Sequence, residues 1–266
     1  MFAFTYHRPH SLRSASAMIN KVEEGKLLAG GQTLLPTMKQ RLASPSDVVD
    51  LAQVPELKGI TVKGSTVIIG AMSTHNEVAT SAAVGEAIPA LAKLAGGIGD
   101  PQVRHKGTIG GSVANNDPAA DYPAACLALN ATIITNKRKI GADAFFKGMF
   151  ETALEPGEII KAISFPVPAR ANYQKFPNPA SRYAVVGVFV AKKGKAVRVA
   201  VTGAGQNGVF RSEQMESALA AKFNAKSLDG ITIPADGLNA DIHAGADYRA
   251  HLIGVMAKRA VTAAAK

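Results

Sequence analysis

The chain of 266 residues contains one cysteine and no tryptophan, and it lacks any long apolar run. Cys126 alone forms no internal disulfide and supplies no zinc or iron–sulfur cluster, so we predict a packed core thiol. The apolar run 184–191 is too short to cross a bilayer, and no charged-then-apolar leader precedes residues 7–9. These absences predict a soluble globular protein with no transmembrane segment.

Acidic residues are also scarce, since 30 lysines and arginines face 20 aspartates and glutamates and give a formal charge of +10. The excess invites a nucleic-acid-binding hypothesis. However, short basic groups such as 137–139 and 192–195 lie beside predicted turns and carry no interleaved stacking aromatics. A solvated surface, an anionic cofactor or an acidic partner subunit explains the charge better.

Local patterns predict an α+β chain in which helices and strands do not alternate strictly. The predicted helices are 11–24 with Gly25 as its stop, 84–98 interrupted at Pro89, 123–129, 212–223 and 248 to the end, and residues 34–42 are predicted as a short helix or turn. The predicted strands are 26–29, 48–51, a hairpin of 60–62 with 67–69, 131–135, 159–165, and an antiparallel pair 183–192 and 197–202. Residues 74–77 have capping-box spacing and open a further helix.

Four prolines between 166 and 179 indicate a domain boundary. We therefore predict an N-terminal domain of residues 1–170 and a C-terminal domain of residues 176–266.

Two glycine pairs are the most informative motifs. Gly30-Gly31 lies in the segment 28–33, between a predicted strand and a helical turn, and Gly110-Gly111 lies in 108–112. A glycine pair followed by a hydroxyl residue allows positive φ, and its successive N–H groups form a concave anion nest. Either loop alone is most often a tight turn, but two together can hold one pyrophosphate.

A third glycine motif, 203–208, fits G-x-G-x-x-G, the fingerprint of dinucleotide-binding Rossmann folds. The preceding strand alternates Val197, Val199 and Val201 with Arg198, Ala200 and Thr202, as a half-exposed antiparallel strand does. We therefore interpret this motif as a loop and predict no NAD site there.

The two paired-glycine loops lie within a longer pattern. It comprises residues 6–9, 29–36, 49–51, 69–74, 155–158, 181–188, 248–249 and 254–256, with its most specific part running from Asp100-Pro101-Gln102-Val103-Arg104 through 107–111 to 117–121. In this pattern the chain resembles the FAD-binding medium subunits of molybdenum hydroxylases, above all those of aerobic carbon-monoxide dehydrogenases. The first loop departs from the family, with Gln32-Thr33 where His-Ser is common.

The resemblance implies a two-lobed FAD-binding domain of the vanillyl-alcohol oxidase/p-cresol methylhydroxylase type, followed by a small C-terminal antiparallel sheet with helices. It also implies an oxidoreductase subunit that passes electrons from iron–sulfur centres on a partner to an external acceptor. The partners are a small iron–sulfur subunit and a large molybdenum subunit that oxidises the substrate, in a dimer of heterotrimers. Localisation would be cytoplasmic, with the complex as the route to any membrane association.

The site residues implied by the resemblance bind FAD non-covalently. Around the two loops they are Leu28, Ala29, Gly30, Gly31, Gln32, Thr33 and Leu34, with Thr108, Ile109, Gly110, Gly111 and Ser112. Elsewhere they are Ile98, Gly99, Val103, Asp121, Ile160, Lys175 and Tyr183. Asp121 either binds the sugar or ribityl hydroxyls of the cofactor or caps a helix. Lys175 either faces the flavin or is a surface lysine. Tyr183 is predicted to cover the isoalloxazine ring.

No residue is predicted as a catalytic acid, base, nucleophile or metal ligand, because the six histidines show no metal spacing. Two other functions stay open at this point. One is a self-sufficient flavin oxidase of the vanillyl-alcohol oxidase group, which the short C-terminal region disfavours, and the other is a basic module that binds nucleic acid.

Overall fold

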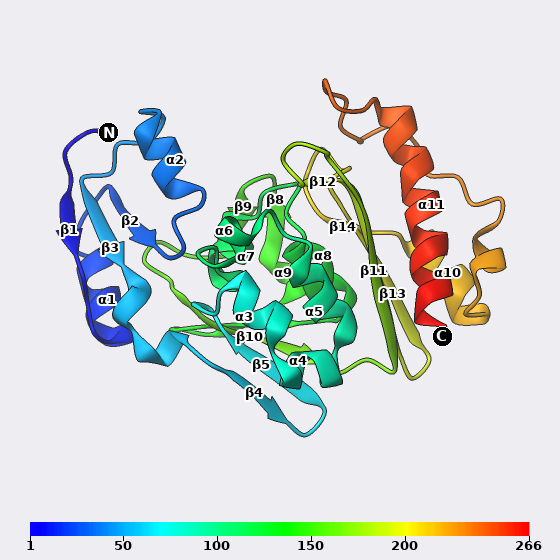
Figure 1. Cartoon of the computed structure of the whole chain (residues 1–266), viewed down its shortest axis with the longest axis horizontal. Helices are drawn as coiled ribbons and strands as arrows, with labels where there is room; N and C mark the ends of the chain where they lie inside the picture. Colours follow the sequence, from blue (N-terminus) through cyan, green and yellow to red (C-terminus); the bar gives the residue numbers. More distant parts are fainter. Residues whose placement is uncertain (266) are drawn as a thin grey trace.

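The computed structural model describes residues 1–265, which form three consecutive parts (Figure 1). We call them the N-terminal lobe (1–57), the middle lobe (58–168) and the C-terminal region (169–265). No helix among the described residues is both long enough and apolar enough to span a membrane.

The N-terminal lobe is a small parallel sheet with the strand order β1-β3-β2. Its elements are β1 (Thr5–His7), α1 (Leu12–Ile19), β2 (Gly25–Leu28), α2 (Leu34–Lys39), β3 (Asp47–Asp50) and the 3-10 turns η1 (Leu51–Gln53) and η2 (Pro55–Leu57). Ala15 and Ile19 of α1 pack against Val49 in a separate small core. Helix α1 ends earlier than predicted, with Asn20 as its C-cap, and Gly25 begins β2 instead of stopping the helix.

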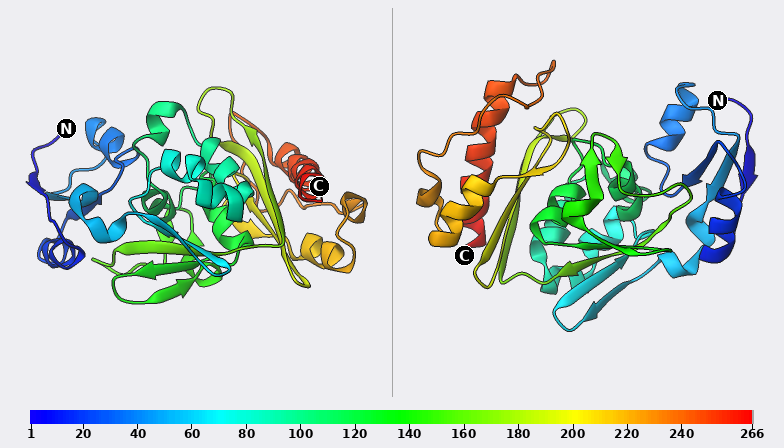
Figure 2. Two further views of the ribbon diagram at one scale, coloured as in Figure 1. Left: turned by 60° about the horizontal axis from the view of Figure 1, so that its bottom comes forward. Right: turned by 180° about the vertical axis from the view of Figure 1, so that it is seen from behind.

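The middle lobe contains a five-stranded antiparallel sheet with the order β4-β5-β10-β6-β7, and helices cover one of its faces (Figure 2). Its strands are β4 (Ile60–Lys63), β5 (Thr66–Gly70), β6 (Thr132–Thr135), β7 (Lys139–Gly141) and β10 (Ile160–Pro166), with β8 (Phe146–Gly148) and β9 (Glu151–Thr152) as a separate pair. Its helices are α3 (His75–Thr80), α4 (Ala82–Ala87), α5 (Pro89–Gly96), α6 (Pro101–Arg104), α7 (Ile109–Asn115), α8 (Tyr122–Ala128) and α9 (Ala142–Phe145).

Two sequence-based predictions for this lobe can be compared with the structure. The predicted helix 84–98 is two helices, because Pro89 lacks the N–H that a continuous helix would need and begins α5 instead. The predicted core thiol is confirmed, since Cys126 lies on the fully buried α8 and burial raises its pKa far above the ordinary value.

The C-terminal region is an antiparallel sheet with the order β11-β12-β13-β14, a shorter helix α10 and a longer helix α11. The elements are β11 (Arg170–Pro177), β12 (Ala184–Lys193), β13 (Ala196–Thr202), β14 (Phe210–Arg211), α10 (Glu213–Ala221), η3 (Ala225–Leu228) and α11 (Ala246–Ala264). Helices α10 and α11 cover one face, and α5 and α8 of the middle lobe contact the other. Residues of β12 therefore alternate between two cores: Val188 and Val190 face α11, and Phe189 joins the core of the middle lobe.

The proline-rich stretch 166–179 is not an irregular connector, because it contains β11, which pairs with β12 along its whole length. Pro166 and Pro177 stand at strand ends, where a missing N–H costs little. The division into domains at residues 170 and 176 stays a prediction.

The loop 203–208 follows the antiparallel strand β13 and leads to the short strand β14, not to a helix, so the rejection of a Rossmann fold is confirmed. The expectation that β13 is half-exposed is wrong. Val199, Ala200 and Val201 are completely buried, because α8 packs on one face of β13 and α10 on the other.

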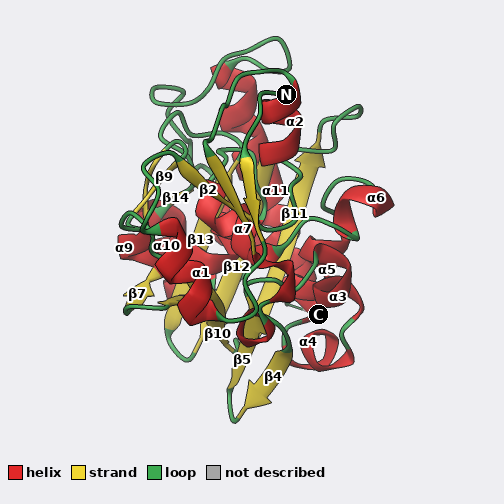
Figure 3. Cartoon of the chain, turned by 90° about the vertical axis from the view of Figure 1, so that its left-hand side faces the viewer, coloured by secondary structure: helices red, strands yellow, loops and turns green. Residues whose placement is uncertain are grey.

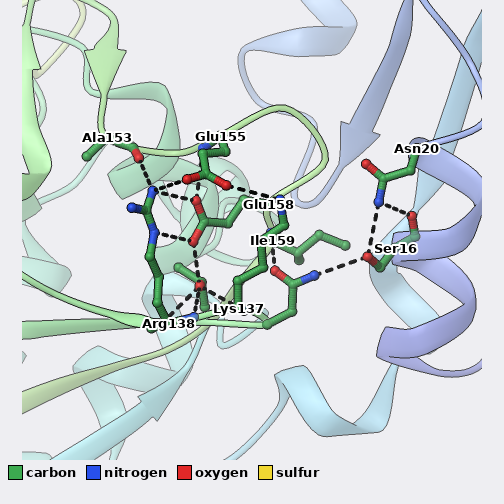
Figure 4. Close-up of polar contacts among 10 residues, drawn as sticks. Ser16, Asn20, Lys137, Arg138, Ala153, Glu155, Glu158 and Ile159 are labelled. Atoms are coloured by element: carbon green, nitrogen blue, oxygen red, sulfur yellow. Dashed lines mark hydrogen bonds and ion pairs between the residues drawn. The ribbon is translucent and has the colours of Figure 1, made fainter.

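A polar network ties the N-terminal lobe to the middle lobe (Figure 4). Asn136, between β6 and β7, donates to Ser16 Oγ of α1 at 3.1 Å and accepts from the Ile159 N–H at 2.9 Å. Next to it, Glu158 accepts from Arg138 and Thr135. Burial raises the pKa of Glu158, but these hydrogen bonds outweigh it and lower the pKa to about 2, so Glu158 is a carboxylate at neutral pH.

Candidate functional site

The first paired-glycine loop lies between β2 and α2, as the sequence predicts, and forms an open row of backbone donors. Gly31 has φ +74°, a conformation that favours glycine. The N–H groups from Gly30 to Thr33 donate no hydrogen bond to any residue within 1–265, although Leu35 N donates back to Gly31 O. Four successive free donors around a positive φ form a nest suited to an anion.

The second paired-glycine loop is built differently, as the start of α7. Thr108 is the N-cap, and its Oγ1 accepts from Gly111 N at 3.1 Å. The N–H groups of Ile109 and Gly110 donate to Ser73 O and Ala71 O. The expectation of a second open nest is therefore wrong: these donors hold the loop against residues 71–73, and the partly exposed Gly111 and Ser112 form its accessible face.

The two loops touch each other, although about 80 residues separate them in the chain. A Cβ added to Gly30 would lie 2.1 Å from Lys106 O and 2.7 Å from the Gly107 Cα. A Cβ added to Gly111 would lie 3.5 Å from the Ala29 Cβ. Figure 3 shows the end of β2 beside α7. Only glycine at position 30 permits this approach of the two backbones.

His75 packs against the second loop and Tyr122 packs against His75, and sequence reasoning missed both. The backbone N–H of His75 donates to Gly107 O at 2.9 Å, and a Cβ at Gly107 would lie 2.6 Å from His75 Nε2. The His75 ring lies 5.4 Å from the Tyr122 ring. The confirmed capping box of Thr74 and Glu77 was the available signal, but it was used only to place the start of α3.

We expect His75 to make the fold sensitive to mild acid. Burial, and then the charge of Arg104, lowers the pKa of His75 from 6.5 to about 4. The unfolded chain therefore binds a proton below pH 6.5 that the folded chain does not take up until about pH 4. The unfolding free energy should fall by about 3 kcal/mol between pH 6.5 and 4. Urea unfolding across this range checks the expectation.

A His75→Gln variant should lose this part of the pH dependence, whereas His251→Gln, which changes an exposed histidine of α11, should keep it. An unchanged pH profile in His75→Gln would assign the acid sensitivity to other groups.

A second group of predicted residues gathers where the middle lobe meets the C-terminal region. Gly99 has φ +51°, and its carbonyl and that of Ile98 each accept from Arg104 Nη1 at 3.0 Å. Val103 connects this group to the loops, because its carbonyl accepts from Gly107 N at 2.7 Å. One continuous stretch, 98–112, therefore runs from the C-terminal region to the first loop.

Asp121 and Lys175 form a buried ion pair in this second group. Lys175 Nζ of β11 lies 3.0 Å from Asp121 Oδ2 and 2.8 Å from Gly97 O, and the Tyr173 hydroxyl donates to Asp121 Oδ1. Asp121 is 4% exposed. Burial raises the pKa of Asp121, while the Lys175 ammonium and the Tyr173 hydroxyl oppose this shift. Asp121 makes no capping hydrogen bond to α8, and Lys175 is not a surface lysine.

Tyr183 lies in the turn between β11 and β12 and is 50% exposed. Partial burial, and then the negative charges of Asp117 and Asp121, raises the pKa of its hydroxyl. The neighbouring Arg182 donates to Gly99 O at 3.5 Å, which places the turn beside the 98–112 stretch.

Ile160 joins neither group directly. It is 5% exposed in the core of the middle lobe, and the carbonyl of the next residue, Lys161, accepts from Ala71 N beneath the second loop. Among residues 1–265, no three His, Cys, Asp or Glu side chains are arranged to hold a metal ion.

Comparisons with known proteins show the family of this chain. Residues 2–168 match the family model of the FAD binding domain in molybdopterin dehydrogenase. The medium chain of carbon monoxide dehydrogenase from Hydrogenophaga pseudoflava is 36% identical over 98% of this chain and 96% of its own. The nicotine 6-hydroxylase medium subunit of Paenarthrobacter nicotinovorans is 35% identical over 98% of this chain and 97% of its own.

Among solved structures, reconstituted CO dehydrogenase from Oligotropha carboxidovorans superposes with a TM-score of 0.89, at 34% identity and over 99% of this chain and 98% of the matched chain. The chain therefore belongs to the family of FAD-binding domains in molybdopterin dehydrogenases and is an FAD-binding oxidoreductase subunit of the molybdenum-hydroxylase type. This confirms the family resemblance, the fold class and the cofactor that the sequence predicts, and it disfavours the self-sufficient oxidase.

Proposed function

We propose that FAD lies along the 98–112 stretch, with its pyrophosphate at the two paired-glycine loops and its ring beside Tyr183. The four free N–H groups of Gly30 to Thr33 carry this proposal, because a pyrophosphate needs donors and these face no protein acceptor within residues 1–265. The hydroxyls of Thr33 and Ser112 add side-chain donors at the same place.

The remaining site residues follow from this placement. Leu28, Ala29, Gln32 and Leu34 shape the first loop, and Thr108, Ile109, Gly110 and Gly111 hold the second loop close to it. Ile98, Gly99 and Val103 line the path between the pyrophosphate and the ring, and Ile160 supports it from the core. Asp121 fixes Lys175 at the ring end, where its ammonium favours negative charge on a bound ligand.

Bound FAD would supply a redox group that takes up and releases electrons singly or in pairs. This chain's own part is to bind and orient it: the loops hold the anionic end, and Tyr183 limits access to one face of the ring.

We propose that this chain works in a cytoplasmic complex with a small iron–sulfur subunit and a large molybdenum subunit, assembled as a dimer of heterotrimers. Electrons would pass from the iron–sulfur centres through this chain to an external acceptor. Relatives named as medium chains or medium subunits support the division of labour, and the formal charge of +10 suits an acidic partner. Any membrane association would come through the complex.

The medium chain of carbon monoxide dehydrogenase and the medium subunit of nicotine 6-hydroxylase are almost equally similar to this chain, at 36% and 35% identity, so the similarity favours neither substrate for the complex.

The chain purified alone tests the proposal. We expect it to bind one FAD with a yellow flavin spectrum, and carbon monoxide or nicotine to leave this flavin oxidised under anaerobic conditions. Reduction should require the iron–sulfur and molybdenum subunits. Reduction of the flavin by an organic substrate in the isolated chain would instead support a self-sufficient oxidase, and a folded chain without FAD affinity would contradict the proposal.

A further inference from the structure

The turn that carries Tyr183 is organised by one buried polar side chain, that of Asn178. Asn178 is 8% exposed, and its Oδ1 accepts from Ala180 N at 2.9 Å and from Ser181 N at 3.0 Å. Its backbone N–H donates to Tyr183 O at 2.8 Å, and its carbonyl accepts from Arg182 N at 2.9 Å. Asn178 therefore closes the turn from both ends.

The turn also contains a backbone conformation that needs support. Arg182 has φ +62°, in the left-handed region that a residue with a Cβ occupies at some cost. This conformation immediately precedes Tyr183, so it sets the direction in which the Tyr183 side chain leaves the backbone. Tyr183 itself makes no side-chain hydrogen bond within residues 1–265, and nothing but the turn fixes it by polar contact.

Asn178 is in turn attached to the segment that precedes α11. Its Nδ2 lies 3.1 Å from His243 Nδ1. Because Oδ1 already accepts two N–H groups, Nδ2 is the donor, so His243 Nδ1 accepts and its proton is on Nε2. Asp241 Oδ1 accepts from His243 N at 2.8 Å and from Ala244 N at 3.1 Å, which shapes this segment.

A second attachment lies on the other side of Tyr183. Arg249 of α11 is 3% exposed, and it donates to Val185 O at 2.6 Å and to Asp241 Oδ2 at 2.7 Å. Positions 178 and 185 flank Tyr183, and both are tied to residues 241–249. The C-terminal region thus holds the short segment around Tyr183 at two points.

We propose that Asn178 is a positioning residue that holds Tyr183 over the flavin by linking its turn to His243. This inference rests on the proposed function, because it assumes that FAD lies beside Tyr183. It assigns the segment 241–245 a role in the flavin site, although no predicted site residue lies there.

Flavin fluorescence and FAD affinity test the proposal, since a tyrosine stacked on the ring quenches flavin emission and stabilises the complex. In Asn178→Ala and His243→Ala we expect FAD to remain bound, its emission to rise several-fold, and its Kd to increase about two- to tenfold, as loss of one aromatic contact would do. His251→Ala, an exposed histidine of α11, is the matched control and should equal the wild type.

A double-mutant cycle separates positioning from general destabilisation. In a Tyr183→Ala background, Asn178→Ala should change emission and Kd no further. Wild-type emission in a folded, FAD-loaded Asn178→Ala variant, or effects that add fully to those of Tyr183→Ala, would overturn the proposal. If Asn178→Ala does not fold, His243→Ala, which removes the same hydrogen bond from the other side, gives the same answer. A wild-type chain that binds no FAD would overturn the proposed function itself, which is a distinct result.

Discussion

Gly30→Ala is expected to weaken FAD binding by roughly 100-fold, the largest loss that we expect from any single methyl group in this chain. The added Cβ would lie 2.1 Å from Lys106 O and 2.7 Å from the Gly107 Cα, and both are backbone atoms that cannot rotate away. The two loops must then separate by about an ångström, and the open donors of the first loop no longer face the second. Isothermal titration of the apoprotein with FAD measures the loss.

Gly85→Ala is the control for this result, and Gly111→Ala is a second test of the contact between the loops. Gly85, within α4, has no atom within 4 Å of an added Cβ, so Gly85→Ala should bind FAD normally and gain about 0.5 to 1 kcal/mol in stability. Gly111→Ala meets Thr108 Oγ1 at 3.0 Å and should give an intermediate loss of affinity, which keeps the test decisive if Gly30→Ala folds poorly. Wild-type affinity in a folded Gly30→Ala protein would show that contact between the loops is not needed for FAD binding.

Lys175→Met is expected to lower the free energy of unfolding by about 3 to 5 kcal/mol, because it leaves the Asp121 carboxylate buried without its cation. Asp121 is 4% exposed, and the Lys175 side chain is 10% exposed, so water cannot replace the missing charge easily. For a chain of this length the melting temperature should fall by roughly 10 °C. Thermal unfolding of the apoprotein, followed by circular dichroism, checks this expectation.

The second substitution Asp121→Asn should restore much of the stability lost in Lys175→Met, since a neutral amide costs less to bury than a carboxylate. Lys258→Met breaks an exposed pair with Asp229 at 2.6 Å and should change stability by less than about 1 kcal/mol. Equal effects of Lys175→Met and Lys258→Met would mean that the Asp121–Lys175 pair adds nothing beyond a surface ion pair.

Much of the local structure follows from short-range patterns. The capping box at Thr74 and Glu77, the hairpin of β4 and β5 and the position of the first loop between β2 and α2 are all found where the sequence predicts them. These features depend on neighbouring residues, whose hydrogen bonds and side-chain periodicity are visible in the chain itself. Helix ends were predicted less well, as the early end of α1 at Ile19 shows, because packing decides where a marginal last turn stops.

Side-chain burial and long-range hydrogen-bond partners could not be predicted in this way. The sequence pattern predicts that the strand containing Val199, Ala200 and Val201 is half-exposed, yet helices from different parts of the chain cover both of its faces. The paired-glycine motif predicts free backbone N–H groups at Ile109 and Gly110, but these groups donate to the carbonyls of Ser73 and Ala71. The capping box placed His75 at the start of α3 but did not show that it contacts Gly107. Tyr122 and Asn178 carried no signal of their contacts with His75 and His243, because these partners are distant in the sequence.

The family, the α+β class and the two glycine pairs follow from the amino-acid sequence, because they depend on residue identity and local spacing. The contacts of Gly30 with Gly107, of Lys175 with Asp121 and of Asn178 with His243 become visible only in the folded chain. Such contacts join segments tens of residues apart, and their partners are selected by the packing of three separate cores, which no local pattern encodes.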